Sequence, residues 1–217
     1  MTSFVIAIDG PAAAGKGTLA RRLARHYGLA FLDTGKLYRA VGLKLLLNNL
    51  LASDTLAAER AARSLRPEDL DMPGLRDEAV AEAASVVAAQ PAVRAALLDF
   101  QKEFARKPPG GAKGAVLDGR DIGTVICPDA QAKLFVHASV EVRAQRRARE
   151  LQDSGREAIY ARVLQDMKDR DERDRSRGIA ALKPAPDAFD LDTSDLDADE
   201  VFKRALTFID QRNRAEA

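Results

Sequence analysis

The residues best suited to chemistry form a glycine-rich segment near the amino terminus. They are Gly10, Pro11, Ala12, Ala13, Ala14, Gly15, Lys16, Gly17 and Thr18. Gly10 and Gly15 lack a Cβ, so backbone N–H groups can wrap closely around an anion there, and Lys16 would neutralise the β- and γ-phosphates of a nucleotide. The segment predicts a phosphate-binding loop for ATP. Gly17 stands where Ser or Thr usually contacts Mg²⁺, so that contact is either absent or made by Thr18.

Arginines and carboxylates recur further along the chain, in three places. The first follows Asp33: Thr34 could cap the next helix, and Tyr38 and Arg39 lie within its first turns. An arginine fork matches the oxygens of a phosphate, so Arg39 could bind an anion next to the loop. A solvated helix residue is the alternative reading of Arg39.

The second place is the turn from Asp118 to Asp121, which follows a predicted strand. Ligands of open parallel sheets bind at the carboxyl ends of the strands, so Arg120 could bind a phosphate and Asp121 a base or sugar. The third place is the run Lys168–Arg177, which also suits a solvent-exposed, ion-paired helix. A helix there would put Arg170, Asp174 and Arg177 on one face, with two guanidiniums around one carboxylate.

Five short apolar runs, each stopped by turn residues, are predicted strands. They are Ser3–Asp9, Ala30–Leu32, Ala115–Asp118, Ala132–Ala138 and Ala188–Asp192. The segments between them have helical spacing, and the predicted helices are Lys16–Tyr27, Lys36–Leu51, Val140–Gln152, Arg156–Arg177 and Ala198–Arg212. Strands that alternate with helices imply an α/β fold with a mostly parallel sheet covered on both faces.

Residues 53–107 have a different composition. They are rich in alanine and charge, poor in strand formers and punctuated by prolines, and Pro108–Gly111 makes a clear break after them. We expect an insert made of several helices.

The composition excludes several classes of protein. The net charge is +1, from 34 Lys and Arg against 33 Asp and Glu, so no overall basic field favours a nucleic acid. Cys127 is the only cysteine, which rules out an intrachain disulfide and a multi-cysteine metal site, and we predict no protein metal site. No signal peptide and no apolar run of about 18 residues is recognisable, so we expect a cytoplasmic protein without a membrane partner.

Five motifs in one order resemble the bacterial cytidylate kinases, within the nucleoside monophosphate kinases. These are GPAAAGKGT, DTGKLYR, AASVVAAQPAVR, LDGRDIGTV and RDERDRSR, and they span nearly the whole chain. The resemblance implies a P-loop three-layer fold with a central parallel five-stranded sheet, a helical acceptor-binding insert and a helical lid. The core would comprise residues 1–52, 108–152 and 181–217, the insert residues 53–107 and the lid residues 153–180.

The resemblance also implies roles for individual residues. Residues 10–18 would hold the ATP phosphates, and the catalytic cations would be Lys16, Arg120, Arg170 and Arg177. The CMP-binding residues would be Thr34, Tyr38, Arg39, Ser85, Arg94, Arg120, Asp121, Arg170, Asp174 and Arg177. Among these, Asp174 would contact the ribose, and Ser85, Arg94 and Asp121 would read cytosine. By composition alone, Ser85 on an alanine-rich helix is more often a space-filling residue.

One segment departs from the family pattern. Bacterial members usually carry a small three-stranded sheet in the insert, and Leu56–Asp77 is too short and too poor in β-branched residues for that sheet. Arg76 aligns with an arginine at the end of that sheet, but Asp77 replaces the threonine expected after it.

The predicted reaction is the phosphorylation of CMP and dCMP by ATP, with Mg²⁺ bound to the nucleotide, in pyrimidine nucleotide metabolism. The partners would be small nucleotides and the protein a monomer. The alternatives are a kinase for AMP, UMP or shikimate, a regulatory P-loop ATPase without an acceptor, and an RNA-binding module. The last has few stacking platforms, because the chain has 8 Phe, 3 Tyr and no Trp.

Overall fold

The computed structural model describes residues 3–176 and 181–215, and for residues 213–215 the backbone alone. Arg177, one of the predicted site residues, lies outside these ranges. The chain divides into two compact units. We call Met1–Leu32 with Ala105–Ala217 the sheet unit, and Asp33–Phe104 the helical unit.

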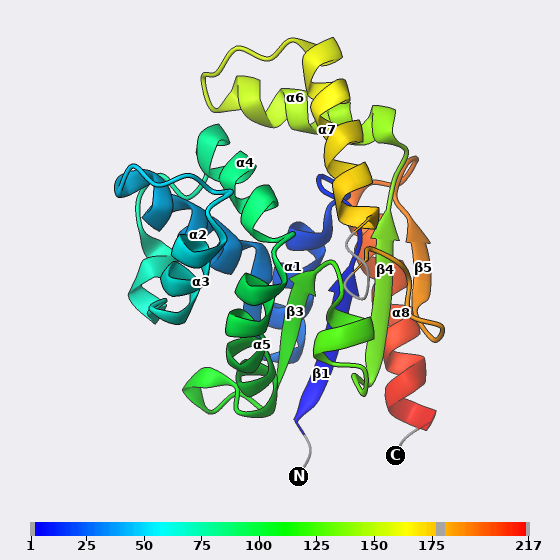
Figure 1. The fold of residues 1–217 in the computed structure, drawn as a ribbon. Helices are drawn as coiled ribbons and strands as arrows, with labels where there is room; N and C mark the ends of the chain where they lie inside the picture. Colours follow the sequence, from blue (N-terminus) through cyan, green and yellow to red (C-terminus); the bar gives the residue numbers. More distant parts are fainter. Residues whose placement is uncertain (1–2, 177–180, 216–217) are drawn as a thin grey trace. The chain divides into compact units, whose positions relative to one another are not determined.

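A five-stranded parallel sheet is the centre of the sheet unit (Figure 1). Its strands are β1 (Phe4–Asp9), β2 (Ala30–Asp33), β3 (Gly114–Gly119), β4 (Ala132–His137) and β5 (Phe189–Asp192), in the order β2-β3-β1-β4-β5. The central strand β1 pairs with β3 and β4, so that Ile6 lies opposite both Val116 and Ala132. Parallel strands end at one edge of the sheet, and the loops after Asp9, Gly119 and His137 therefore start side by side.

Apolar side chains on one face of the sheet form the main core. Ile6, Ile8 and Leu134 on that face pack against α1 (Lys16–Tyr27) and α8 (Ala198–Ala215). A near-continuous run of apolar residues, as in β1, favours a strand buried on both faces, because each face then has its own apolar row. The short π-helix η3 (Ile122–Ile126) contacts β1 and β3, and the turn η2 (Pro109–Gly111) precedes β3.

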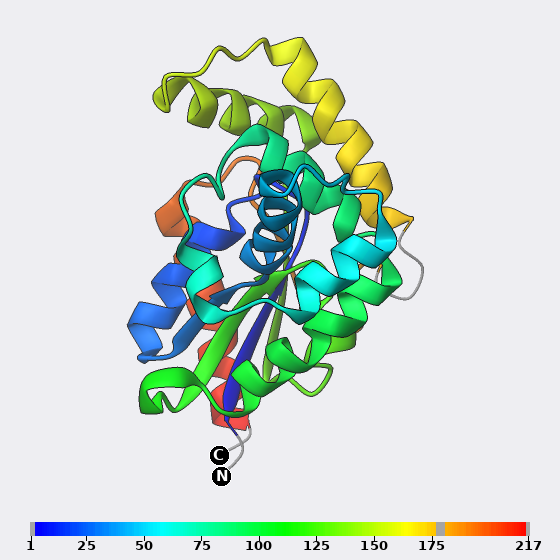
Figure 2. The ribbon, with the colours of Figure 1, turned by 60° about the vertical axis from the view of Figure 1, so that its left-hand side comes forward.

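Two long helices form a hairpin between β4 and β5. They are α6 (Val140–Asp153) and α7 (Tyr160–Arg175), and Figure 2 shows them side by side, joined by a loop. Ala144 and Leu151 of α6 pack against Val163 and Met167 of α7. This narrow apolar seam leaves the charged faces of both helices available for other contacts.

The helical unit contains α2 (Thr34–Leu47), α3 (Thr55–Arg63), the 3₁₀ turn η1 (Pro67–Asp71), α4 (Glu78–Val87) and most of α5 (Pro91–Arg106). Leucine, valine and alanine side chains of these helices share one core. At Gly42, a Cβ would lie 3.1 Å from the Ala83 Cβ and the Ala84 N, so glycine and alanine let α2 and α4 approach closely.

All five predicted strands are present, and each strand end lies within one residue of its predicted position. The insert is helical as expected, and residues 53–107 contain no strand, which agrees with the missing three-stranded sheet. Two predictions about α2 are wrong. The helix ends at Leu47 instead of Leu51, because Asn49 takes the left-handed conformation with φ 55°. Thr34 is the first helical residue and not the cap, which is Asp33.

In the described ranges, every single helix is too short or too polar to cross a membrane, and only the bent pair Glu78–Val87 and Pro91–Gly111 passes by length and composition.

Candidate nucleotide-binding site

The loop between β1 and α1 has a backbone that only glycine permits at its first position. Gly10 has φ +149°, and a Cβ added there would lie 1.9 Å from the carbonyl oxygen of Val136 in β4. No rearrangement of a side chain could relieve such a clash with backbone. Gly10 therefore lets the loop leave β1 directly over the end of the neighbouring strand.

Two further residues of the loop take left-handed conformations. Ala13 has φ 58° and Gly15 has φ 90°. For Ala13 this costs on the order of 1–2 kcal/mol, and such strain is concentrated at functional sites. Alternation of right- and left-handed residues turns successive N–H groups toward one point and forms an anion-binding concavity. No side chain caps the start of α1 at Gly15, which suits a helix whose first amides bind an anion.

Lys16 is the first residue of α1 and is only 6% exposed. Its Nζ donates a hydrogen bond to the Pro11 carbonyl oxygen at 2.8 Å and is 3.8 Å from Oδ1 of Asp118. The ammonium is thus folded back onto its own loop, next to a buried carboxylate. Sequence analysis gave Asp118 no role, although its place at the end of a strand was a usable signal. Thr18 is exposed on the first turn of α1.

The loop is braced from the end of β5. The Thr193 hydroxyl is 3.1 Å from the carbonyl oxygens of Ala14 and of His137, and can donate to either. Arg146 of α6 donates to the same hydroxyl at 3.0 Å and to the Thr193 carbonyl oxygen at 2.6 Å. Thr193 is 2% exposed. Sequence analysis missed it, because a threonine after a short strand carries no signal of its own.

The turn after β3 meets α7 through an ion pair. Arg120 Nε donates to Oδ2 of Asp174 at 2.8 Å, and the Asp174 side chain is 1% exposed. Burial lowers the pKa of Arg120, but the attraction of Asp174 outweighs it and the net shift is upward, so the guanidinium stays charged. Asp121 is buried next to it, and Arg170 is half-buried one turn before Asp174. The structure therefore brings Arg120 to the carboxylate of the predicted α7 cluster.

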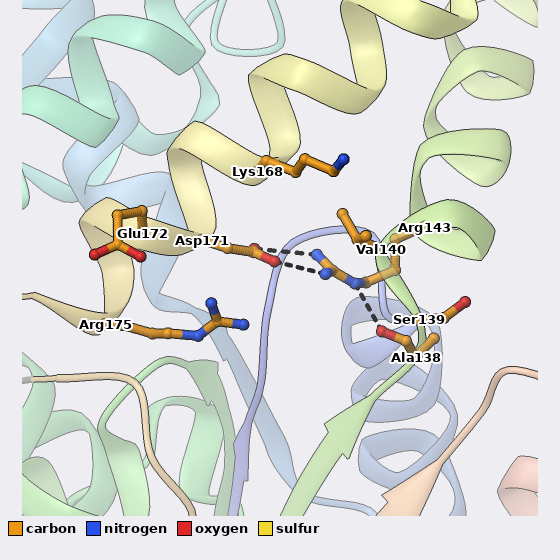
Figure 3. A pocket seen from close by; sticks show the side chains of 8 residues that line it. All are labelled: Ala138, Ser139, Val140, Arg143, Lys168, Asp171, Glu172 and Arg175. Carbon is orange, nitrogen blue, oxygen red and sulfur yellow. Dashed lines mark hydrogen bonds and ion pairs between the residues drawn. The ribbon is translucent and has the colours of Figure 1, made fainter.

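A polar pocket of about 450 Å³ lies between the end of β4 and the helices α6 and α7 (Figure 3). Arg143 lines this pocket and donates two hydrogen bonds to the Asp171 carboxylate, at 3.1 and 2.6 Å. Lys168 and Arg175 of α7 lie on either side of this pair in the view. Arg143 Nη1 also donates to the Ala12 carbonyl oxygen at 3.3 Å, so the pocket adjoins the phosphate loop. This site was also missed, since α6 contains several arginines with nothing to distinguish them.

The helical unit holds the other predicted acceptor residues. Thr34, Tyr38 and Ser85 are buried, and the Arg94 guanidinium lies 5.7 Å from the centre of the Tyr38 ring. Arg94 also donates to the Ala88 carbonyl oxygen at 3.3 Å, and Arg39 donates to the Leu75 carbonyl oxygen at 3.0 Å.

Ser85 differs from its neighbours because it is 3% exposed and its hydroxyl has no hydrogen-bond partner within the described part of the chain. A buried hydroxyl without a partner costs about 1–3 kcal/mol, which a bound ligand could recover. This observation favours a binding role over simple space filling.

Residues with metal-ligand chemistry are scattered. Among the described residues, no group of three or more His, Cys, Asp or Glu side chains is arranged to hold a metal ion.

Comparison with known proteins places this chain in a family. The family model described as cytidylate kinase matches residues 6–211. The chain belongs to the cytidylate kinase family. A family member named cytidylate kinase, from Paramagnetospirillum magneticum, is 64% identical over 95% of this chain and 98% of its own. Another with that name, from Methylocella silvestris, is 59% identical over 95% of this chain and 94% of its own.

Solved structures agree with the family at the level of fold. A gluconokinase from Sinorhizobium meliloti superposes with a TM-score of 0.52 at 12% identity, covering 99% of this chain and 95% of the other. At that identity the likeness concerns the fold alone. Like the P-loop kinases, this member of the cytidylate kinase family has a central parallel sheet with helices on both faces.

Proposed function

We propose that this chain transfers the γ-phosphoryl group of ATP to CMP and dCMP, giving ADP with CDP or dCDP, in pyrimidine nucleotide metabolism. The observation that carries the proposal is the strained, glycine-shaped loop over the sheet edge, with Lys16 folded onto it, in a member of the cytidylate kinase family. Its substrates would be small nucleotides, and no nucleic acid or membrane is needed.

The phosphate loop would bind the ATP phosphates through the backbone amides of residues 10–18. Lys16 would exchange its contact with the Pro11 carbonyl oxygen for the β- and γ-phosphates, since a charged oxygen is the stronger acceptor. The exposed Thr18 hydroxyl would help to hold a Mg²⁺ ion bound with the nucleotide, and that ion would supply charge neutralisation at the phosphates. The polar pocket around Arg143 adjoins the same loop and would receive another part of ATP.

Arginines would bind the acceptor phosphate and the group in transfer. Arg120, with its charge secured by Asp174, would act there together with Arg39, Arg170 and Arg177. Phosphoryl transfer depends on positioning and on neutralising the equatorial oxygens, and the acceptor phosphate is already ionised. A general base is therefore unnecessary.

Cytosine recognition would come from Ser85, Arg94 and Asp121. Cytosine has a carbonyl oxygen, a ring nitrogen acceptor and an exocyclic amine donor, which an arginine, a hydroxyl and a carboxylate complement. Tyr38 and Thr34 would line the pocket, and Asp174 would also serve the ribose. The unpartnered Ser85 hydroxyl supports this part of the proposal.

Closure would protect the reaction from water. We assign the core to residues 1–52, 108–152 and 181–217, the acceptor-binding insert to residues 53–107 and the lid to residues 153–180. Closure of both over the substrates would limit hydrolysis of ATP, as in other phosphotransferases with mobile segments.

The test is a panel of acceptors. ADP release from Mg²⁺·ATP should be fastest with CMP and dCMP, slower with UMP and AMP, and absent with shikimate. Arg177→Ala should lower kcat/KM for CMP by about 10²-fold, a loss typical of one transition-state contact. Arg204→Ala, an exposed arginine of α8, serves as the matched control. Equal rates with and without acceptor would indicate an ATPase, and full activity of Arg177→Ala would remove the arginine clamp.

A further inference from the structure

Asp9 is a buried carboxylate at the end of β1, one residue before the phosphate loop. It is 4% exposed. Its Oδ1 accepts a hydrogen bond from the Ile122 N–H and its Oδ2 from the Gly123 N–H, both at 2.7 Å. One side chain thus satisfies two consecutive amides of the turn that follows β3. Sequence analysis assigned it no role.

The two amides belong to the turn that presents Arg120 and Asp121. Asp121 has φ −145° and ψ 28°, outside helical values, and η3 starts directly after it at Ile122. The first N–H groups of a helix have no partner within it, so they need another acceptor. Asp9 is that acceptor, and it therefore fixes the point at which the turn leaves the sheet.

The fit around this contact is tight. A Cβ at Gly123 would lie 3.2 Å from Lys133 Cδ and 3.4 Å from Asp9 Oδ2, so a larger residue there would press on the Lys133 side chain next to the carboxylate. Burial raises the pKa of the Asp9 carboxyl to about 7, although both amides and Lys16 lower it. A buried carboxylate that accepts hydrogen bonds from two backbone N–H groups fits a structural role in the site and not that of a solvated surface residue.

We propose that Asp9 is a positioning residue, which ties the Arg120–Asp121 turn to the strand that carries the phosphate loop. The proposal rests on the proposed function, in which these two side chains bind the acceptor. The substitution Asp9→Asn would keep the shape of the side chain but turn an NH₂ group toward one of the two amides. Two donors then face each other, and the turn moves, which matters because a misplacement of about 1 Å can cost about 10²-fold in rate.

The first experiment compares Asp9→Asn with the wild type in steady-state kinetics. We expect kcat with CMP to fall about 30- to 100-fold, while KM for ATP changes less than about threefold. Ile209→Val, a buried substitution in α8, is the control for a simple loss of stability. If Asp9→Asn changed the kinetic parameters for ATP and for CMP equally, and Ile209→Val did the same, the loss would reflect stability alone and the proposal would be overturned.

A second variant disturbs the same contact from the other side. Gly123→Ala keeps the carboxylate but places a methyl group against the Lys133 side chain and Asp9 Oδ2, so it should disturb the contact and reproduce the CMP-specific loss even where Asp9→Asn does not fold. Full activity of Gly123→Ala would contradict the proposal.

A double-mutant cycle tests whether Asp9 acts through Arg120. In an Arg120→Gln background, Asp9→Asn should cost less than about threefold, because the side chain that it positions is gone. Full additivity of the two losses would show that Asp9 acts elsewhere.

Hydrogen exchange separates this proposal from the function itself. In the wild type the Ile122 and Gly123 amides should be protected, and Gly123→Ala should lose that protection whether or not CMP is the acceptor. A wild type that does not phosphorylate CMP would refute the proposed function alone. Unprotected amides in the wild type would refute the positioning role alone.

Discussion

The phosphate loop and the helical unit differ in how each would serve the proposed function. In the loop, backbone geometry dominates: Gly10, Ala13 and Gly15 turn the chain, and Lys16 contributes the one cationic side chain of residues 10–18. In the helical unit the backbone groups are hydrogen-bonded within helices, so the proposed recognition of the acceptor depends on side chains such as Ser85 and Arg94. A site made of backbone is visible as a short motif, whereas a site made of side chains depends on packing.

The comparison predicts that the loop controls catalysis and the helical unit controls the choice of acceptor. Substitutions in each region should therefore change different kinetic parameters.

The largest effect should come from Lys16→Met. It removes the only side-chain cation of the loop, so kcat should fall on the order of 10³- to 10⁴-fold, while calorimetry should detect nearly unchanged binding of CMP. Lys16→Arg, which keeps the charge but not its compact shape, should fall in between. If CMP binding is lost together with turnover, the division of labour between the two regions is wrong.

The next effect is the pH dependence of the unfolding free energy that the Asp9 carboxyl should cause. Its pKa is raised from 3.8 to about 7, so between these values the folded chain retains a proton that the unfolded chain has released. This contribution to stability is complete below pH 3.8 and is lost as pH rises through about 7.

Relative to Asp9→Asn, the wild type should thus lose about 3 kcal/mol of unfolding free energy between pH 5 and pH 8, as measured by urea denaturation. Titration of the Asp9 carboxyl carbon by NMR gives the pKa directly. Parallel pH curves for the two proteins would contradict the assignment.

Ser85→Ala should give a smaller effect, confined to the acceptor. Removing a buried hydroxyl without a partner leaves stability unchanged or about 1 kcal/mol higher, but KM for CMP should rise about tenfold. KM for ATP should stay constant. The control is Ser64→Ala, an exposed serine at the end of α3. A fall in stability without any change in KM would return Ser85 to a space-filling role.

Thr193→Val should give the smallest effect and sharpen the description of the loop. Valine keeps the shape but removes the hydroxyl that braces the Ala14 carbonyl oxygen, so KM for ATP should rise about fivefold, consistent with one lost hydrogen bond. Thr193→Ser, which keeps the hydroxyl, should behave like the wild type. An equal rise in both variants would mean that the methyl group, not the hydroxyl, supports the loop.

Several features could be predicted from the sequence because they depend on neighbours in the chain. The spacing of apolar residues gave the five strands and most helices, and the glycines of residues 10–15 gave the loop. The ends of α2 were less accurate, since a left-handed Asn49 and a cap at Asp33 depend on how the surrounding turns close. Resemblance to a family, not local pattern, selected Ser85 and Arg94.

The sequence by itself determined the order of strands along the chain, the phosphate loop and the helical character of residues 53–107, because periodicity and glycine conformations act over a few residues. Only the tertiary structure brought Asp9 to Ile122 and Gly123, Arg120 to Asp174, Arg143 to Asp171 and Thr193 to Ala14. These partners lie from 28 to 179 residues apart. Which buried polar groups meet at such separations depends on strand order and on the packing of α6 and α7, and no local pattern encodes that.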